Sequence, residues 1–325
     1  MSLFASWLAS PPPDAAIEIA TDHVSVAVVS ERGRGLAVQG YAVEPLPAGA
    51  VVASLISPNI LNRTAVVTAL RNALERAGAR PRRVALIIPD LAAKVSLVRF
   101  ETTPARREDL DQLVRWQVRK ASPFPLEEAS VTFSSGVRGA DGSAEFLVVT
   151  ARRDIIAEYE AVCDELRVYA GLVDLATLSV VNLFLGSSDV PAGDWLVVHL
   201  RPDYTSIVIM RGGDVIFFRN RAEGGEESIA DLVHQTAMYY QDRLSGHRFA
   251  RAFLGGSGRV AGAVESARRS LEERLGVSVE SIDPTRTAAL TDRISVTSDL
   301  MDVLAPLVGM MLRSRQERAA LVSES

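Results

Sequence analysis

The chain has 325 residues, of which 48% are hydrophobic, and a formal net charge of -5 at pH 7. This length and apolar content allow a large core, which is expected to divide into two lobes. The negative charge balance, without a basic block, argues against a nucleic-acid surface. Only one cysteine is present, and the four histidines lack HxxxH or HExxH spacing, so neither a disulfide framework nor a metal site has support. The lack of disulfides is consistent with a reducing compartment.

The first residues, 1–13, are expected to form a flexible arm. Leu3, Phe4, Trp7 and Leu8 stand at helical spacing there, ahead of a run of prolines. This spacing suits an arm that touches a membrane or docks on a partner, although a frayed terminus is the simpler explanation. The arm lacks the features of a signal peptide, and no run in the chain approaches the roughly 18 apolar residues that a membrane span needs.

The first lobe is expected to begin with a β-hairpin. Apolar residues dominate from Ala16 to Val29, a glycine-bearing turn follows, and the apolar pattern resumes from Leu36 to Val43. A helix is predicted from Asn62 to Ala77, because its apolar residues share one face and Gly78 follows. Arg83–Pro89 is then a continuous apolar run, typical of a strand that is buried on both faces.

The next unit, residues 96–169, reads as a strand, a helix, two strands and a further helix, and suggests a subdomain inserted into the first lobe. In its most informative segment, RWQVRKASPFPLEE, an amphipathic helix carrying Trp116 runs into a Pro-Phe-Pro turn. Pro123 and Pro125 fix their own backbone angle and push the residue before them out of the helical region. Phe124 is therefore expected to stand on a stiff, extended surface turn, with a plain helix stop as the alternative.

The second lobe repeats the start of the first. Trp195–Arg219 reads as three strands joined by tight turns, and a helix is predicted from Glu226 to about Leu244. The strand Arg251–Leu254 leads into a glycine turn, and two helices follow, the last near residues 298–317. The turn consists of Gly255, Gly256, Ser257 and Gly258.

This repetition predicts a duplicated α/β fold of two lobes. The first lobe comprises residues 14–95 and 170–190, the inserted subdomain residues 96–169, and the shorter second lobe residues 191–325. Any ligand is expected in the cleft between the lobes.

Several segments, in the order in which they occur, resemble the type IV pilus assembly protein PilM family. The PFPLEE turn is the most specific of them, whereas the glycine turn alone is a weak signal. The resemblance implies a bilobal, actin-like ATPase fold (duplicated and ribonuclease-H-like, as in the cell-division protein FtsA) with an inserted subdomain in the first lobe. The match extends from about Ile17 to Arg313 and includes VEPLPAGAVV (Val43–Val52), VALIIPD (Val84–Asp90), LVVTARRDIIAEYEAVCDE (Leu147–Glu165), RNRAEGG (Arg219–Gly225), AFLGGSGRVAG (Ala252–Gly262) and LAPLVGMMLR (Leu304–Arg313).

The resemblance also implies a function and a location. Proteins of this family lie at the cytoplasmic face of the inner membrane, in the pilus alignment and assembly platform. There they capture the short cytoplasmic N-terminal tail of PilN, a single-span membrane protein, and other platform proteins are further expected partners. Contact with the membrane would be indirect or through the N-terminal arm. A related adaptor of type II secretion is an alternative, although a membrane span is usual in that relative.

The two phosphate loops of an actin-like ATPase are altered in this chain. Such proteins hold phosphates with two glycine-bearing turns that often start Asp-x-Gly. In the first, a family-like DIGSSSVK corresponds to Glu18–Ser25, EIATDHVS, where Glu replaces the aspartate, Ala the glycine and Ser the basic residue. In the second, DIGASST corresponds to His199–Thr205, where Arg201 replaces the glycine and Pro202 removes a backbone donor. Arg201 could alternatively supply a phosphate contact of its own.

These losses predict a scaffold that binds no nucleotide. Each broken loop forgoes hydrogen bonds of about 1–3 kcal/mol each, which together would weaken a micromolar site beyond the millimolar range. The Gly255–Gly258 turn, which would lie beneath an adenine, is then a vestige. ATP with Mg²⁺ remains the alternative cofactor.

Two hypotheses follow for the function. The first is an adaptor that holds an extended peptide by main-chain pairing, in a cleft between the first lobe and the inserted subdomain. Trp116, Pro123, Phe124 and Pro125 are its candidate partner-binding residues, because aromatic anchors are frequent in such sites. The second is an active actin-like ATPase or small-molecule kinase with nonstandard loops. No catalytic residue is predicted, because the acidic pairs are sequence neighbours and the serines lack partners.

Overall fold

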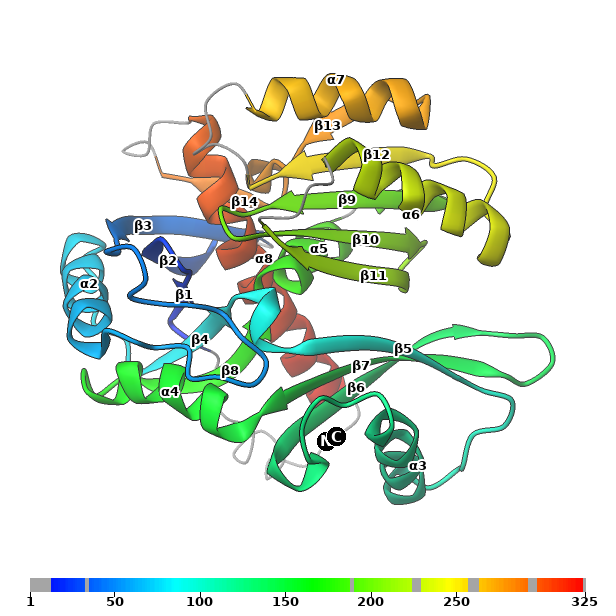
Figure 1. Cartoon of the computed structure of the whole chain (residues 1–325). Coiled ribbons are helices and arrows are strands. Elements are labelled where there is room, and N and C mark those ends of the chain that lie inside the picture. The colour runs from blue at the N-terminus through cyan, green and yellow to red at the C-terminus, as the bar shows by residue number, and fades with distance from the viewer. Residues whose placement is uncertain are drawn as a thin grey trace.

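The computed structural model describes residues 13–32, 35–187, 190–223, 229–256, 263–291 and 297–323. These residues form two lobes, each built on a mixed β-sheet, and a three-stranded unit beside the first lobe (Figure 1). Residues 1–12 of the predicted arm lie outside the described residues. Among the described residues, no helix combines the length and the apolar character that crossing a membrane requires.

The first-lobe sheet has six strands in the order β14-β3-β2-β1-β4-β8. Neighbouring strands among β1, β2 and β3 are antiparallel, whereas β4 pairs in parallel with both β1 and β8. A turn after Ile19 divides the segment predicted as one hairpin arm into two strands. β14 pairs in parallel with β3, so this short segment, which the sequence assigns to the second lobe, extends the first-lobe sheet. The strands are β1 (Ala15–Ile19), β2 (His23–Arg32), β3 (Gly35–Pro45), β4 (Arg83–Ile88), β8 (Tyr169–Leu175) and β14 (Ala288–Leu290).

The second-lobe sheet has five strands in the order β11-β10-β9-β12-β13. It repeats the arrangement of the first lobe, because three antiparallel strands come first and β12 then pairs in parallel with β9. The predicted meander of strands is therefore present. The strands are β9 (Asp194–Leu200), β10 (Tyr204–Arg211), β11 (Asp214–Ala222), β12 (Arg251–Gly255) and β13 (Val279–Ser281).

Two helices, α5 and α8, lie between the sheets, and two more cover the outer face of each sheet (Figure 1). Both sheets share one core with α5 and α8, which includes Val38, Ile87, Trp195 and Phe253. Separate cores form under the outer helices of the first lobe and of the second lobe. The helices are α2 (Arg63–Arg76), α4 (Arg153–Asp164), α5 (Ala176–Leu185), α6 (Ile229–Arg243), α7 (Ala263–Leu275) and α8 (Ser298–Ser323).

The crossing of α5 and α8 depends on a glycine. A Cβ atom added at Gly309 would lie 1.9 Å from the carbonyl oxygen of Ser179, which is far inside van der Waals contact. Glycine therefore lets the backbones of the two central helices approach each other. Because this crossing lies in the core shared by both sheets, it helps to fix the two lobes relative to each other.

The inserted unit is a three-stranded sheet in the order β5-β7-β6, with α3 packed on one face. Its elements are β5 (Lys94–Phe100), α3 (Arg107–Arg119), β6 (Ala129–Arg138) and β7 (Ala144–Arg152). The sequence also groups the next helix, α4, with this unit. In the structure, Ile155, Tyr159 and Val162 of α4 are buried in the first-lobe core instead. An amphipathic helix at the end of the segment can cover either neighbouring sheet, and periodicity alone does not distinguish the two.

Candidate functional site

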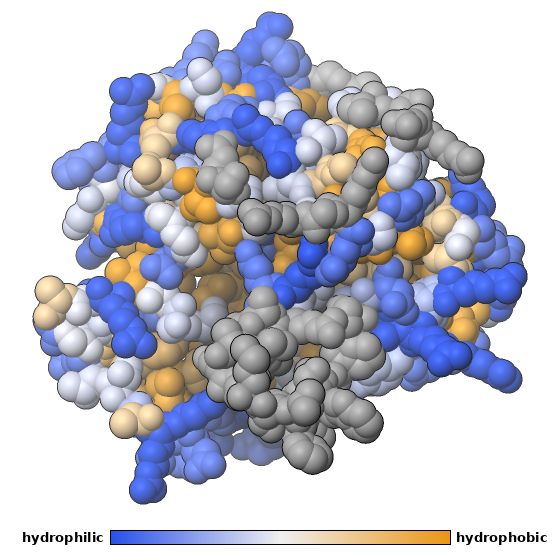
Figure 2. Space-filling model, turned by 180° about the vertical axis from the view of Figure 1, so that it is seen from behind, coloured by the Kyte–Doolittle hydropathy of each residue, from blue (hydrophilic) through white to orange (hydrophobic). Residues whose placement is uncertain are grey.

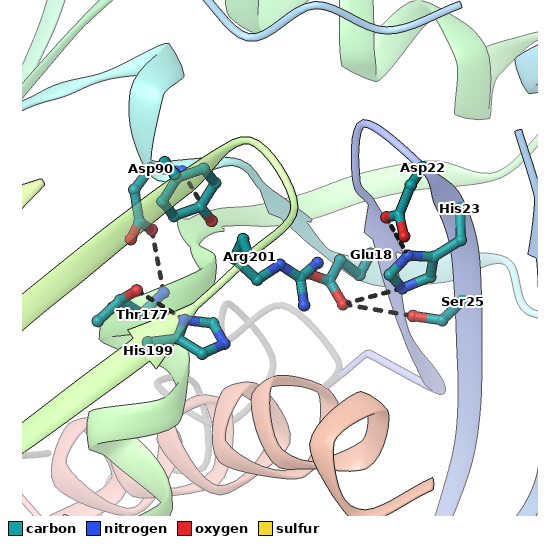
Figure 3. Close-up of polar contacts among 9 residues, drawn as sticks. Glu18, Asp22, His23, Ser25, Asp90, Thr177, His199 and Arg201 are labelled. Atoms are coloured by element: carbon teal, nitrogen blue, oxygen red, sulfur yellow. Dashed lines mark hydrogen bonds and ion pairs between the residues drawn. The ribbon is translucent and has the colours of Figure 1, made fainter. Parts of the chain in front are cut away.

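The two predicted phosphate loops face each other and are joined by a buried ion pair (Figure 3). Glu18 lies near the end of β1 and Arg201 directly after β9. The Arg201 Nη2 atom lies 2.5 Å from the Glu18 Oε1 atom, and the side chains are 6% and 1% exposed. Burial, the largest single effect, would raise the pKa of Glu18, but Arg201, His23 and His199 together outweigh it and lower the pKa to about 2. Glu18 is therefore ionised, and Arg201 is already neutralised from within the chain.

The first loop adds further groups around Glu18. The Ser25 hydroxyl donates to Glu18 Oε2 over 3.5 Å, and the His23 Nε2 atom lies 3.7 Å from the same oxygen. The other His23 ring nitrogen, Nδ1, lies 2.6 Å from the Asp22 carboxylate. The positions where phosphate oxygens would be expected thus hold two carboxylates, which repel an anion.

A second buried network ties the lobes together through Asp90, which follows β4. Its carboxylate accepts hydrogen bonds from the Thr177 backbone N–H at 3.0 Å and from the Ser206 hydroxyl at 2.5 Å. Thr177 Oγ1 in turn lies 2.8 Å from His199 Nδ1 (Figure 3). Burial raises the pKa of Asp90 despite these bonds, whereas burial and then Arg201 lower the pKa of His199 to about 3. The sequence reasoning did not single out Asp90, although an acid directly after a buried strand was a usable signal.

The predicted glycine turn lies against the second loop. Gly256 has φ +83°, and an added Cβ would lie 2.3 Å from the Leu200 carbonyl oxygen. Its backbone N–H donates to the Asp302 carboxylate at 2.9 Å, so this donor is already used. Gly255 must likewise lack a side chain, because an added Cβ atom there would collide with Ile282. Packing explains both glycines without a nucleotide, while Ser257 and Gly258 lie outside the described residues.

Little space remains between these loops. Among the described residues, the cavity lined by Arg201, Pro202 and Gly256 has a volume of about 20 Å³. Ligand pockets usually measure about 300–1,000 Å³. Three carboxylates, those of Asp22, Asp299 and Asp302, also line it, a surface that disfavours a triphosphate.

A much larger cavity, of about 550 Å³, lies between the inserted unit and the two lobes; we call it the edge cavity. It is lined by β6 between Ser130 and Gly136, by β8 from Leu172 to Leu175, and by the β10–β11 turn at Gly213 and Asp214. Seen from behind, the molecule is hollowed between the inserted unit and the second lobe, and apolar residues gather there (Figure 2).

Two sheet edges border the edge cavity. In the described residues, β8 ends the order of the six-stranded sheet and β6 ends that of the three-stranded sheet. An edge strand carries backbone N–H and C=O groups that have no partner strand on one side. The face of β7 toward the cavity is apolar, with Leu147, Val149 and Ala151. The site thus offers main-chain hydrogen bonds beside an apolar wall.

The four predicted partner-binding residues do not line this cavity. Trp116 is 61% exposed on α3, and α3 packs on the β7 residues Phe146 and Val148, which alternate with those facing the cavity. Trp116 therefore lies on the opposite side of the small sheet. Phe124 is only 8% exposed and belongs to the core of the inserted unit. The expectation of an exposed ring is wrong, because the Pro-Phe-Pro turn directs Phe124 inward against α3.

The described residues hold neither a metal-ligand cluster nor a reactive cysteine. No group of three or more metal-ligating side chains is found among them. Cys163 is buried, and burial raises the pKa of its thiol to about 12, so it is not a reactive nucleophile.

Several solved structures are similar to this chain. Among solved structures, it is similar to a chain of the PilM-PilN type IV pilus biogenesis complex, with a TM-score of 0.80 and 17% identity over 94% of this chain and 99% of that chain. It also matches a Bacteroides thetaiotaomicron protein with an actin-like ATPase fold and unknown function, with a TM-score of 0.48 and 11% identity over 86% and 93% of the chains. A third match is the ethanolamine utilization protein EutJ from Carboxydothermus hydrogenoformans, with a TM-score of 0.47 and 9% identity over 94% and 90%.

The predicted fold class, bilobal and actin-like as in PilM, is confirmed by the match to the chain of the PilM-PilN complex, with its TM-score of 0.80. The sequence profile of the type IV pilus assembly protein PilM matches residues 16–244, which is more than half of the chain. The match includes the whole inserted unit and both altered phosphate loops. The chain therefore belongs to the type IV pilus assembly protein PilM family.

Proposed function

We propose that this protein is an adaptor of the type IV pilus assembly platform that works without ATP hydrolysis. It binds the extended, cytoplasmic N-terminal tail of a PilN-like single-span membrane protein and is held at the cytoplasmic face of the inner membrane by that partner. The similar solved complex of PilM with PilN supports the kind of partner. Family membership supports the platform.

The observation that carries this proposal is the edge cavity. An extended peptide can add to the edge of a sheet by main-chain pairing, while its alternate side chains enter pockets on either side. The cavity presents β6 and β8 as two such edges. Its volume of about 550 Å³ lies within the usual range for ligand sites. This matches the predicted cleft between the first lobe and the inserted subdomain.

The phosphate loops support the proposal that the protein works without ATP hydrolysis. Arg201 is neutralised by Glu18, and the Gly256 N–H is bonded to Asp302. A nucleotide would have to break both contacts and open a cavity of about 20 Å³. Removing the partner of a buried charge costs about 3–5 kcal/mol, which offsets what two phosphate hydrogen bonds of about 1.5–3 kcal/mol each would return.

The test is peptide binding. A synthetic peptide with the sequence of the N-terminal tail of the PilN-like protein from the same organism is expected to raise the melting temperature. At about 100 µM peptide, a 1 µM site adds about 2.7 kcal/mol to the free energy of unfolding. No thermal shift, together with no capture of the protein on immobilised peptide, would overturn the proposal.

A variant pair locates the binding. Ser134 is exposed on β6 and lines the edge cavity, so Ser134→Trp is expected to fill the cavity and abolish the shift. Arg138→Trp places the same ring on the same strand but outside the cavity lining, and is expected to leave the shift unchanged. Equal binding by both variants would place the peptide elsewhere.

A further inference from the structure

The edge cavity has an uneven set of charged groups. Among the described residues that line it, the ionisable side chains are Glu160 on α4, Asp174 on β8, Asp214 at the start of β11 and Arg313 on α8. Arg313 forms an ion pair with Asp174, whose side chain is 6% exposed. The cation of the cavity is therefore already paired, and two carboxylates remain.

Neither Glu160 nor Asp214 has an ion pair or side-chain hydrogen bond with another described residue. Burial, and then the neighbouring charge of Asp164, raise the pKa of Glu160. A carboxyl group in this position lacks a compensating cation, although it is half-buried beside apolar residues such as Ile156. A lysine or arginine side chain that entered the cavity would supply this missing positive charge.

We propose that the edge cavity selects a peptide that carries a lysine or arginine among its apolar residues, with Glu160 as the acidic group that receives the cation and Asp214 as a second one. This inference rests on the proposed function and specifies the chemistry of the peptide. The proposed source fits, because cytoplasmic segments next to a membrane span are enriched in lysine and arginine. An acidic or purely apolar tail would leave two carboxylates uncompensated.

The charge contact should affect specificity measurably. A hydrogen bond between charged groups contributes about 1.5–3 kcal/mol when it is shielded from water, which is roughly ten- to hundred-fold in affinity. Glu160 is only partly buried, so the lower end, about ten-fold, is expected. The apolar contacts and the main-chain pairing should persist without it.

The experiment uses two fluorescein-labelled peptides and the full chain. The first is the N-terminal tail of the PilN-like protein of the same organism, and the second is the same tail with each lysine and arginine replaced by norleucine. Fluorescence anisotropy is expected to show about ten-fold weaker binding of the second peptide. With Glu160→Gln, most of this difference should disappear, and the part that remains is assigned to Asp214.

A control variant removes an acid from the end of the same helix without touching the cavity. Glu165 follows α4, pairs with Arg63 and lies outside the cavity lining. Glu165→Gln should keep the full difference between the peptides, and Asp214→Asn should reduce it. Binding of the norleucine peptide to Glu160→Gln shows that this variant is folded.

The outcomes separate the two proposals. If both peptides bind the unmodified chain equally well, the charge selection is overturned and the adaptor function stands. If the difference persists in Glu160→Gln and in Asp214→Asn, these carboxylates are not the cation's partners and the inference fails. If neither peptide binds, the proposed function itself fails, and this inference with it.

Discussion

Arg201 and Glu18 join the two phosphate-loop positions of the fold through one buried ion pair, 2.5 Å from nitrogen to oxygen. The residues are 183 positions apart in the sequence and belong to different lobes. By resemblance to a PilM-like loop, Arg201 stands at the position of a glycine. The residue at this position therefore forms a buried contact between the two lobes.

The first prediction concerns the stability of this pair. Arg201→Gln leaves the Glu18 carboxylate buried without its cation and is expected to lower the free energy of unfolding by about 3–5 kcal/mol in urea denaturation. The double variant with Glu18→Gln should lose less than the sum of the single changes, because the remaining charge is gone. Arg119→Gln is the control, since the Arg119–Glu127 pair is exposed on both sides and should contribute about 0–1 kcal/mol. Equal effects of Arg201→Gln and Arg119→Gln would contradict the assignment.

The second prediction concerns acid sensitivity. The folded protein keeps His199 neutral down to about pH 3, whereas the unfolded chain binds a proton near pH 6.5. The unfolded state therefore binds more protons between these values, and stability should fall as the pH falls, by up to about 1.4 kcal/mol per pH unit. Glu18 adds a loss at lower pH, between its ordinary pKa of 4.5 and its folded pKa of about 2.

The measurement is the free energy of unfolding as a function of pH. In His199→Asn, the slope between pH 6.5 and 4.5 should become shallower. His234 is exposed on α6, so His234→Asn should leave the slope unchanged. A slope that is insensitive to His199→Asn would show that another group controls the acid transition.

The third prediction concerns nucleotide. Isothermal titration with ATP and Mg²⁺ at about millimolar concentration is expected to give no binding heat, because the altered loops should weaken the site beyond a Kd of about 1 mM. Such a site has a binding free energy of less than about 4.1 kcal/mol in magnitude. Gly256→Arg is a poor probe of this site, since any side chain at Gly256 would collide with Leu200 and disturb the fold. Saturable binding in the micromolar range would instead favour the ATPase alternative.

The sequence predicted the repeated elements well, because strand and helix patterns are local. It also showed that both phosphate loops are altered, since residues such as Arg201 and Pro202 can be compared directly with the glycine-bearing pattern of a family-like loop. It could not predict that Arg201 would meet Glu18, because a single sequence carries no signal for a contact between distant positions. The edge cavity was predicted only as a cleft. Its lining comes from β6, β8, α4 and α8, which the fold alone brings together.

The aromatic segment shows the same limit at close range. Trp116 lies on an amphipathic helix and Phe124 in the Pro-Phe-Pro turn after it, and local rules fix the stiffness of that turn. Which ring is buried depends on where α3 rests on the small sheet. The structure buries Phe124 and exposes Trp116.

The fourth prediction uses these two rings. Phe124→Ala is expected to destabilise the inserted unit by about 3–5 kcal/mol, because it leaves a cavity among Val114, Val118 and Leu126. Trp116→Ala should change stability by less than about 0.5 kcal/mol, since its ring is largely in water. Urea denaturation of both variants checks this order, and the reverse order would mean that α3 is packed differently.

The fifth prediction concerns the central helix crossing. Gly309→Ala adds a Cβ atom that would lie 1.9 Å from the Ser179 carbonyl oxygen, so α8 must move away from α5. Overpacking of this kind usually costs about 1–3 kcal/mol. Because the contact is between backbones, no side chain can rotate away to relieve it, and the upper end of that range is expected. A lower melting temperature of Gly309→Ala checks the loss.

Gly213→Ala is the matched control for this change. An added Cβ there meets nothing within 4 Å, and the residue has no left-handed backbone angle. Its melting temperature should therefore stay near that of the unmodified chain. The core at the crossing also contacts both sheets, so Gly309→Ala should weaken tail-peptide binding in the edge cavity, which is lined by both lobes. Unchanged stability and unchanged binding in Gly309→Ala would show that the crossing tolerates a wider spacing and does not set the position of the lobes.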